Sequence, residues 1–262
     1  MLVLLSPAKK LDFDSTVRTT LYSQPQFIDE AAALVEVLKQ YSEADLAALM
    51  KLSPALAKLN VERFQTWVPR FDLSNSRQAF LAFAGDVYDK LEAGTLSDEA
   101  LEWAQQRVVM LSGLYGILRP LDLMQPYRLE MGTRLPTEQG KNLYEYWGDQ
   151  ITQALNQQLQ ALPATDNPAS RTVINLASAE YFRAVKKPLL DAPVVDCVFQ
   201  DYKNGDWKVI GFHAKRARGL MTRFIIDNTC STPQDLQSFA SEGYTYSAEQ
   251  SSDKRLVFRR QQ

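Results

Sequence analysis

Short apolar runs alternate along this chain with longer segments in which apolar residues recur every three or four positions. The runs at residues 1–5, 107–111 and 172–177 have the length and the continuous apolar character of buried strands. They end in the loops SPAKK, LSGLYG and NLASAEYF. Because ligands of α/β sheets usually bind at the carboxyl ends of strands, these loops converge on one site if the three strands share a direction.

Helical periodicity accounts for much of the remaining chain. Residues 25–40 carry apolar side chains at the spacing of an amphipathic helix. By the same spacing and by capping residues, further helices are predicted at residues 42–50, 53–67, 74–84, 86–91, 97–106, 142–159 and 214–226, with a short one after Thr232.

The last third of the chain also contains hairpin signals. Asn204 followed by Gly205 predicts a tight turn between strands at residues 194–199 and 207–212. Residues 244–246 and 256–259 predict a second hairpin, and residues 163–170 a polar surface loop. Together with the helices, these elements predict an α+β fold in which residues 1–262 form one mixed α/β domain.

Residues 46–64 outline two short helices joined by Lys51, Leu52 and Ser53. A serine followed by Pro54 is typical of an N-cap and the first helical turn. The outline is compatible with a helix-hairpin-helix, in which hairpin N–H groups and the second helix's N-terminus bind a phosphate. The usual hairpin contains glycines, which this one lacks, so a plain helical hairpin is the alternative.

The stretch LSGLYGILRPLDLMQPYRLEMG, residues 111–132, combines glycines and prolines with large apolar and charged side chains. This mixture predicts a packed loop whose inward charges need partners. It is either a structured connection whose arginines pair with its own acids, or part of a functional site. The second interpretation predicts that Lys9, Arg119 and Glu180 lie near one another.

The predicted helix at residues 214–226 separates an apolar stripe from four cations, Lys215, Arg216, Arg218 and Arg223, which we place on the opposite face. Three of them occupy the first turns, where positive charge opposes the helix dipole. No acid lies between Lys215 and residue 226 to neutralise them. The cations form either a solvated face or a surface that binds anions.

Composition narrows the classes of function. The 262 residues carry a formal net charge of −2, so any attraction to nucleic acid has to be local. One histidine and two cysteines exclude a Cys/His structural zinc site within one chain. Cys197 lies in the apolar run VVDCVF and is interpreted as a small core residue, with a peroxide-sensing thiol as the alternative. No apolar run is long enough for a signal peptide or a membrane span, so we expect a cytosolic location.

Six motifs, taken together and in order, resemble the bacterial YaaA peroxide-resistance family over the whole chain: MLVLLSPAKKLDF, LAFAGDVYDKL, LSGLYGILRPLDLMQPYRLEMG, NLASAEYF, AKRARGLMTRFII and SEGYTY. The resemblance implies a cytosolic protein that helps bacteria to survive hydrogen peroxide, by limiting free iron and the DNA damage that it drives. It also implies a mixed α/β fold with a basic cleft and a helix-hairpin-helix that binds duplex or distorted DNA. It supplies no catalytic mechanism.

On these grounds we expect a DNA-binding surface without a metal ion or cofactor. Its residues would be Lys9, Lys10, Lys51, Ser53, Arg119, Arg128, Arg134, Lys215, Arg216, Arg218 and Arg223. Several phosphate contacts need about this many cations. No recognition helix is apparent, so binding should follow the DNA backbone and shape.

The alternative is an enzyme that acts on a nucleic acid or a phosphorylated small molecule. Its polar pocket would lie at the strand ends and include Asp122, Glu130, Glu180 and Tyr181. No Ser/His/Asp order, P-loop or nucleotide glycine fingerprint supports this alternative, so binding without catalysis is favoured.

Overall fold

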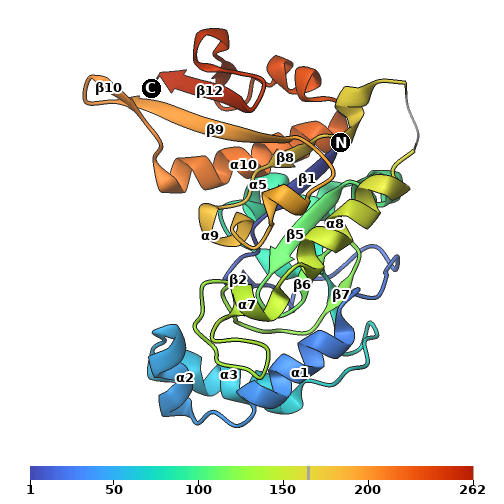
Figure 1. The fold of residues 1–262 in the computed structure, drawn as a ribbon, viewed down its shortest axis with the longest axis vertical. Coiled ribbons are helices and arrows are strands. Elements are labelled where there is room, and N and C mark those ends of the chain that lie inside the picture. The colour runs from blue at the N-terminus through green and yellow to red at the C-terminus, as the bar shows by residue number, and fades with distance from the viewer. Residues whose placement is uncertain (164–165, 262) are drawn as a thin grey trace.

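The computed structural model describes residues 1–163 and 166–261. Within these residues, eight strands form one mixed sheet in the order β11-β12-β9-β8-β1-β5-β6, with β10 paired to β9. The strands are β1 (Leu2–Leu5), β5 (Val108–Ser112), β6 (Gly116–Leu118), β8 (Val173–Asn175), β9 (Val194–Lys203), β10 (Asp206–Lys208), β11 (Thr245–Tyr246) and β12 (Arg255–Gln261). The strands β12, β9, β8, β1 and β5 run parallel (Figure 1). The carboxyl ends of β8, β1 and β5 meet at one end of the sheet, and β9 and β12 extend beyond them.

The three apolar runs predicted as strands form the centre of this sheet. β1 lies between β8 and β5, and the register pairs Val3 with both Ile174 and Val108. All four residues of β1 and all five of β5 are buried. Continuous apolar sequence fits this position because a central parallel strand is covered on both faces.

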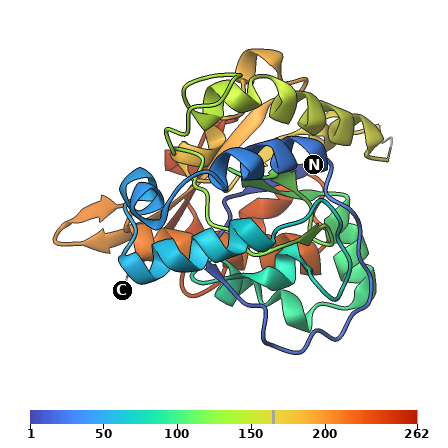
Figure 2. The same ribbon diagram turned by 90° about the horizontal axis from the view of Figure 1, so that it is seen from below.

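Helices cover the two faces of the sheet. α10 (Gly211–Asp227) and α8 (Gln150–Ala161) lie on opposite faces (Figures 1 and 2). α10 packs against α5 (Tyr88–Leu91) and α6 (Asp98–Gln105). Separately, α7 (Leu143–Trp147) contacts α1 (Ile28–Leu38), where the Tyr146 hydroxyl donates to the Glu30 carbonyl at 2.7 Å. No helix in the described ranges is long and apolar enough to cross a membrane.

Two helix predictions need correction. The helix predicted at residues 142–159 is broken into α7 and α8 at Gly148, whose φ is +49°. The helix predicted at residues 74–84 is mostly absent: α4 (Ala79–Ala82) is flanked by β3 (Arg77–Gln78) and β4 (Phe83–Ala84), which pair with β7 (Leu123–Met124) and β2 (Lys10–Leu11). Pairing with distant segments therefore overrides the local helical pattern here.

The two helices predicted within residues 46–64 are confirmed as α2 (Glu43–Met50) and α3 (Pro54–Thr66), far from β10 in Figure 1. The Ser53 side chain caps α3 by accepting from the Leu56 N–H, and Lys51 ends α2 with a φ of 53°. Leu52 between them is only 9% exposed and joins the core. The loop therefore has a fixed shape, with a left-handed residue where a glycine is usual.

Both predicted hairpins are present, but the strand predicted at residues 207–212 ends at Lys208, and its last two residues begin α10. β9 and β10 are joined by Asn204 and Gly205, with φ of 55° and 81°, and β11 pairs antiparallel with β12. The predicted polar loop at residues 163–170 lies partly outside the described residues, and its last part is a 3-10 turn, Pro168–Arg171. One cluster of buried side chains extends from Met1 to Phe258, so the elements share a continuous core.

Candidate functional site

A cavity of about 450 Å³ opens where the parallel strands end. We call it the strand-end pocket. It is lined by residues 6–10 after β1, residues 84–88 at the start of α5, residues 127–130, residues around α9 (Ala179–Phe182) after β8, and by Lys215 and Arg218 of α10. The loops after β1 and β8 converge as predicted because these strands are adjacent and parallel.

Hydrogen bonds through Ser6 fix the loops relative to one another. The Ser6 carbonyl accepts from the Tyr88 hydroxyl at 2.9 Å, and its side-chain oxygen accepts from the Ser178 N–H at 2.8 Å. One residue after β1 therefore connects the start of α5 to the loop after β8. This wall of the pocket is built from three segments that are far apart in sequence.

The segment 127–130 is held against the end of β5 by close packing. A Cβ atom at Gly113 would overlap the Leu129 carbonyl, so a side chain at this position would displace the segment. The Tyr127 and Ser112 hydroxyls are 2.6 Å apart and share a hydrogen bond. Further along, the Gly132 N–H donates to a Glu180 carboxylate oxygen at 2.9 Å, which links this loop to α9.

The charges around the strand-end pocket are unequal. Its described lining contains five cations, Lys9, Lys10, Arg128, Lys215 and Arg218, and three acids, Asp86, Glu130 and Glu180. Glu130 contacts both Lys9, at 2.9 Å, and Arg128, at 3.4 Å, and Lys215 lies 3.8 Å from Asp86. Most of these pairs are partly exposed, so each contributes little to stability and can exchange partners.

Arg218 differs from the other cations of α10. Its guanidinium has no ion pair or hydrogen bond with any described side chain, and its Nε atom is buried. Burial lowers the pKa of Arg218, because the charged form loses hydration. The Nε atom of Arg128 is likewise buried without a partner. Two arginines of one pocket thus retain unused hydrogen-bond donors.

Arg63 of α3 also belongs to this neighbourhood. Burial lowers its pKa, and the nearby charge of Arg128 lowers it further. Arg63 is not among the predicted contacts, because nothing in its local sequence separates it from other helical cations. In the structure it follows the fully buried Asn60 by three residues, which places both on a partly buried side of α3.

Three tyrosines form much of the uncharged lining. Tyr88, Tyr127 and Tyr181 are buried, and burial raises the pKa of each phenol above its ordinary value. They are therefore neutral at physiological pH. Tyr88 and Tyr127 already use their hydroxyls within the protein, and none of the three tyrosines supplies a phenolate base.

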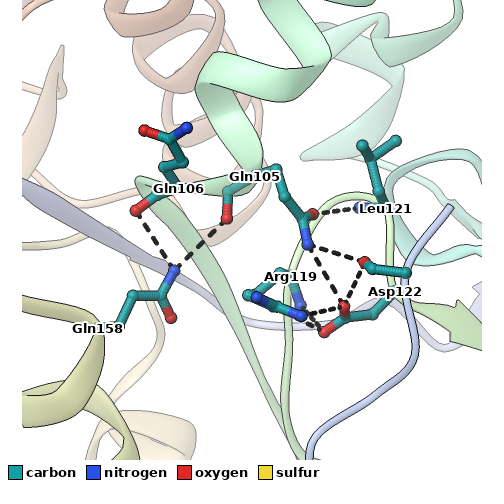
Figure 3. A network of polar contacts seen from close by, with 7 residues as sticks. Gln105, Gln106, Arg119, Leu121, Asp122 and Gln158 are labelled. Atoms are coloured by element: carbon teal, nitrogen blue, oxygen red, sulfur yellow. Dashed lines mark hydrogen bonds and ion pairs between the residues drawn. The ribbon is translucent and has the colours of Figure 1, made fainter. Parts of the chain in front are cut away.

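The prediction that Arg119 joins Lys9 and Glu180 is wrong. Arg119 follows β6, which runs antiparallel to β5, so it lies at the opposite end of the sheet. There it pairs with Asp122, which is 1% exposed, at 3.0 Å (Figure 3). Asp122 is excluded from the strand-end pocket for the same reason. Gln105 of α6 completes the network by accepting from the Leu121 N–H at 2.7 Å (Figure 3).

The other predicted cations are dispersed. Arg134 is exposed and lies outside the lining of the pocket. Arg216 lies 3.6 Å from Glu242, and Arg223 lies 2.8 Å from Asp227. Lys51 is exposed at the α2–α3 hairpin, apart from the strand-end lining.

The interpretation of the cationic face of α10 also needs correction. Acids from outside the segment 215–226 partly neutralise three of its four cations: Asp86, Glu242 and Asp227. Gly219 and Thr222, on the side of the helix away from the apolar stripe, are buried as well. The helix is therefore packed on two sides rather than solvated on one.

Both thiols are buried. Burial raises the pKa of Cys197 to about 12 and that of Cys230 to about 11. The prediction that Cys197 is a small core residue is confirmed, since it is 6% exposed. In the parts of the chain that the structure describes, no group of three His, Cys, Asp or Glu side chains is placed to hold a metal ion.

Comparison with known proteins assigns this sequence to a family. The model of the peroxide stress protein YaaA family matches residues 1–250. The chain belongs to this family. UPF0246 proteins of Bordetella petrii and Bordetella pertussis are 58% and 59% identical to this YaaA-family chain, over 99% and 100% of both sequences. A UPF0246 protein of Burkholderia lata is 52% identical, over 99% of this chain and 98% of its own length.

Proposed function

We propose that this protein binds duplex or distorted DNA in the bacterial cytosol during peroxide stress, independently of sequence, and limits iron-driven oxidative damage to it. The contact surface surrounds the strand-end pocket. The observation that carries the proposal is the gathering there of five cations against three acids, in a chain whose formal net charge is −2. A local excess of positive charge is what attraction to phosphates needs.

The α2–α3 hairpin supplies a second contact in this proposal. Lys51 is exposed at its tip, and the N-terminus of α3 begins at Pro54 beside it. A helix N-terminus favours a phosphate because its free N–H groups and its dipole point toward the anion. Arg63, on the same helix and near Arg128, makes α3 a connection between the hairpin and the strand-end pocket.

The two buried thiols favour protection over peroxide chemistry. A thiol reacts with peroxide as the thiolate, and both thiols are shielded with raised pKa values. Binding that shields DNA needs no such group. The connection to iron rests on membership of the peroxide stress family and on the resemblance given above.

The test is a fluorescence anisotropy titration with several unrelated duplexes over a range of salt concentrations. We expect binding at low salt that weakens steeply as salt rises, equally for every sequence. Lys10→Ala/Lys215→Ala should weaken all duplexes alike and lower the salt slope by about 2, one for each lost phosphate contact. Lys51→Ala should lower it by about 1.

Arg119→Ala is the matched control, because Arg119 lies at the opposite end of the sheet and pairs with Asp122. It should leave DNA affinity unchanged. Absence of binding at low salt, a flat salt dependence, or an equal loss in the control would each overturn the proposal.

A further inference from the structure

We propose that the strand-end pocket binds a single nucleotide unit, with its phosphate against Arg218 and Arg128 and its base or sugar against Tyr88, Tyr127 and Tyr181. The unit is either a free nucleoside monophosphate or a nucleotide that has left the stack of a DNA strand. The second source rests on the proposed DNA binding, whereas the first does not.

The unpaired donors of Arg218 and Arg128 indicate an anionic ligand. A guanidinium whose Nε atom is buried without a partner is costly, since it loses hydration without a compensating hydrogen bond. The other cations of α10 have acidic neighbours, and Arg218 has none among the described residues. Arginine is also the side chain best suited to bind a phosphate through two parallel hydrogen bonds.

The rest of the pocket is larger and more varied than an inorganic anion requires. Its volume of about 450 Å³ lies in the range of small-molecule sites. Three neutral tyrosines line it, and aromatic side chains are the groups on which bases stack. Glu130 and Glu180 supply carboxylates that can accept hydrogen bonds from base amino groups or sugar hydroxyls.

The walls limit what can enter. The pocket is bounded by the loops after β1 and β8, which Ser6 joins to the start of α5, by the segment 127–130, which packs on Gly113, and by α10. Tyr88, Tyr127 and Tyr181 are only 5–8% exposed, so a base still stacked in a duplex across the opening would not reach them. A nucleotide of DNA would therefore have to be unpaired and turned outward, as in enzymes that bind a flipped base.

The first experiment measures binding of dAMP, deoxyadenosine and inorganic phosphate by isothermal titration calorimetry. We expect dAMP to bind, phosphate to bind more weakly and deoxyadenosine not to bind. Arg218→Met, which keeps an apolar stem, should weaken dAMP binding roughly tenfold or more, because hydrogen bonds to a charged group are lost. Arg223→Met is the control on the same helix, since Arg223 pairs with Asp227, and it should leave dAMP binding unchanged.

Thermal melting of both variants checks that they are folded, and Arg218→Lys, which keeps the charge, should retain part of the affinity in a folded protein. The inference is overturned if the wild-type protein does not bind dAMP, if deoxyadenosine binds equally well, or if folded Arg218→Met binds dAMP like wild type.

A second experiment separates the two sources of the nucleotide. A duplex with one unpaired nucleotide is compared with the fully paired duplex of the same sequence. Tighter binding of the first duplex, abolished by Arg218→Met, supports a nucleotide of DNA as the ligand. Equal binding of both duplexes, together with dAMP binding, supports a free nucleotide. Binding of dAMP without binding of either duplex would overturn the proposed function and leave the pocket inference standing.

Discussion

Gly219→Ala should destabilise the protein although alanine is the better helix former. Replacing a glycine inside a helix by alanine stabilises the helix by about 1 kcal/mol. At Gly219, however, a Cβ atom would overlap the Val87 carbonyl oxygen, and would lie 2.9 Å from the Val87 carbonyl carbon and 3.0 Å from the Lys90 Cβ. Comfortable carbon contacts are about 3.5–4.0 Å, so α10 and α5 would have to separate by about 1 Å.

Such overpacking costs about 1–3 kcal/mol, and a clash with backbone belongs to the upper part of that range. The expected net loss is therefore about 1–2 kcal/mol in the free energy of unfolding. In a chain of this size that lowers the melting temperature by about 2–8 °C. Because Val87 and Tyr88 line the strand-end pocket together with Arg218, the shift should also weaken dAMP binding.

Gly211→Ala is the matched control in the same helix, since a Cβ atom there would meet nothing within 4 Å. It should change stability by less than about 0.5 kcal/mol, as surface substitutions usually do. Urea unfolding followed by tryptophan fluorescence measures both variants. A Gly219→Ala protein as stable as wild type, or more stable, would refute the close packing of α10 on α5.

Two further predictions concern buried groups. Cys197 and Cys230 should both resist a thiol reagent at pH 8 in the native protein, because burial raises the pKa of each thiol. Both should react fully once guanidinium unfolds the protein. Rapid labelling of either thiol in the native protein would contradict its burial. Asp201→Asn should destabilise the protein by about 3 kcal/mol in urea unfolding, because Arg260 loses its buried counter-charge. The Arg260 Nε atom lies 2.7 Å from the Asp201 carboxylate, and the Arg260 side chain is 12% exposed. Asp206→Asn, on the surface, is the control and should have little effect.

The sequence predicted the parts of the site that depend on local pattern. β1, β5 and β8 are continuous apolar runs, and a strand buried on both faces needs such a run. The prediction that their end loops converge assumed that the three strands share a direction, which the sequence does not show. The strands do share a direction, and this brings Lys9 and Glu180 to one pocket.

The failures come from long-range structure. The predicted position of Arg119 is wrong because the chain reverses at Gly116, whose φ is +65°, and β6 runs back along β5. A stretch rich in glycine and proline does not show in which direction the chain continues. The charges of α10 were misread because their partners, such as Asp86 and Glu242, lie far away in the sequence. For the same reason, nothing local distinguished Arg218 as the α10 cation that has no acidic neighbour among the described residues.

The central claim is that DNA contacts the carboxyl end of the parallel strands, and lysine footprinting by mass spectrometry tests it most directly. Surface lysines are acetylated with and without a duplex. We predict protection of Lys9, Lys10 and Lys215, which line the strand-end pocket. Lys254, which is exposed and outside the lining of that pocket, should be modified equally in both samples. Unchanged modification of the three pocket lysines, or protection of Lys254 instead, would contradict the account.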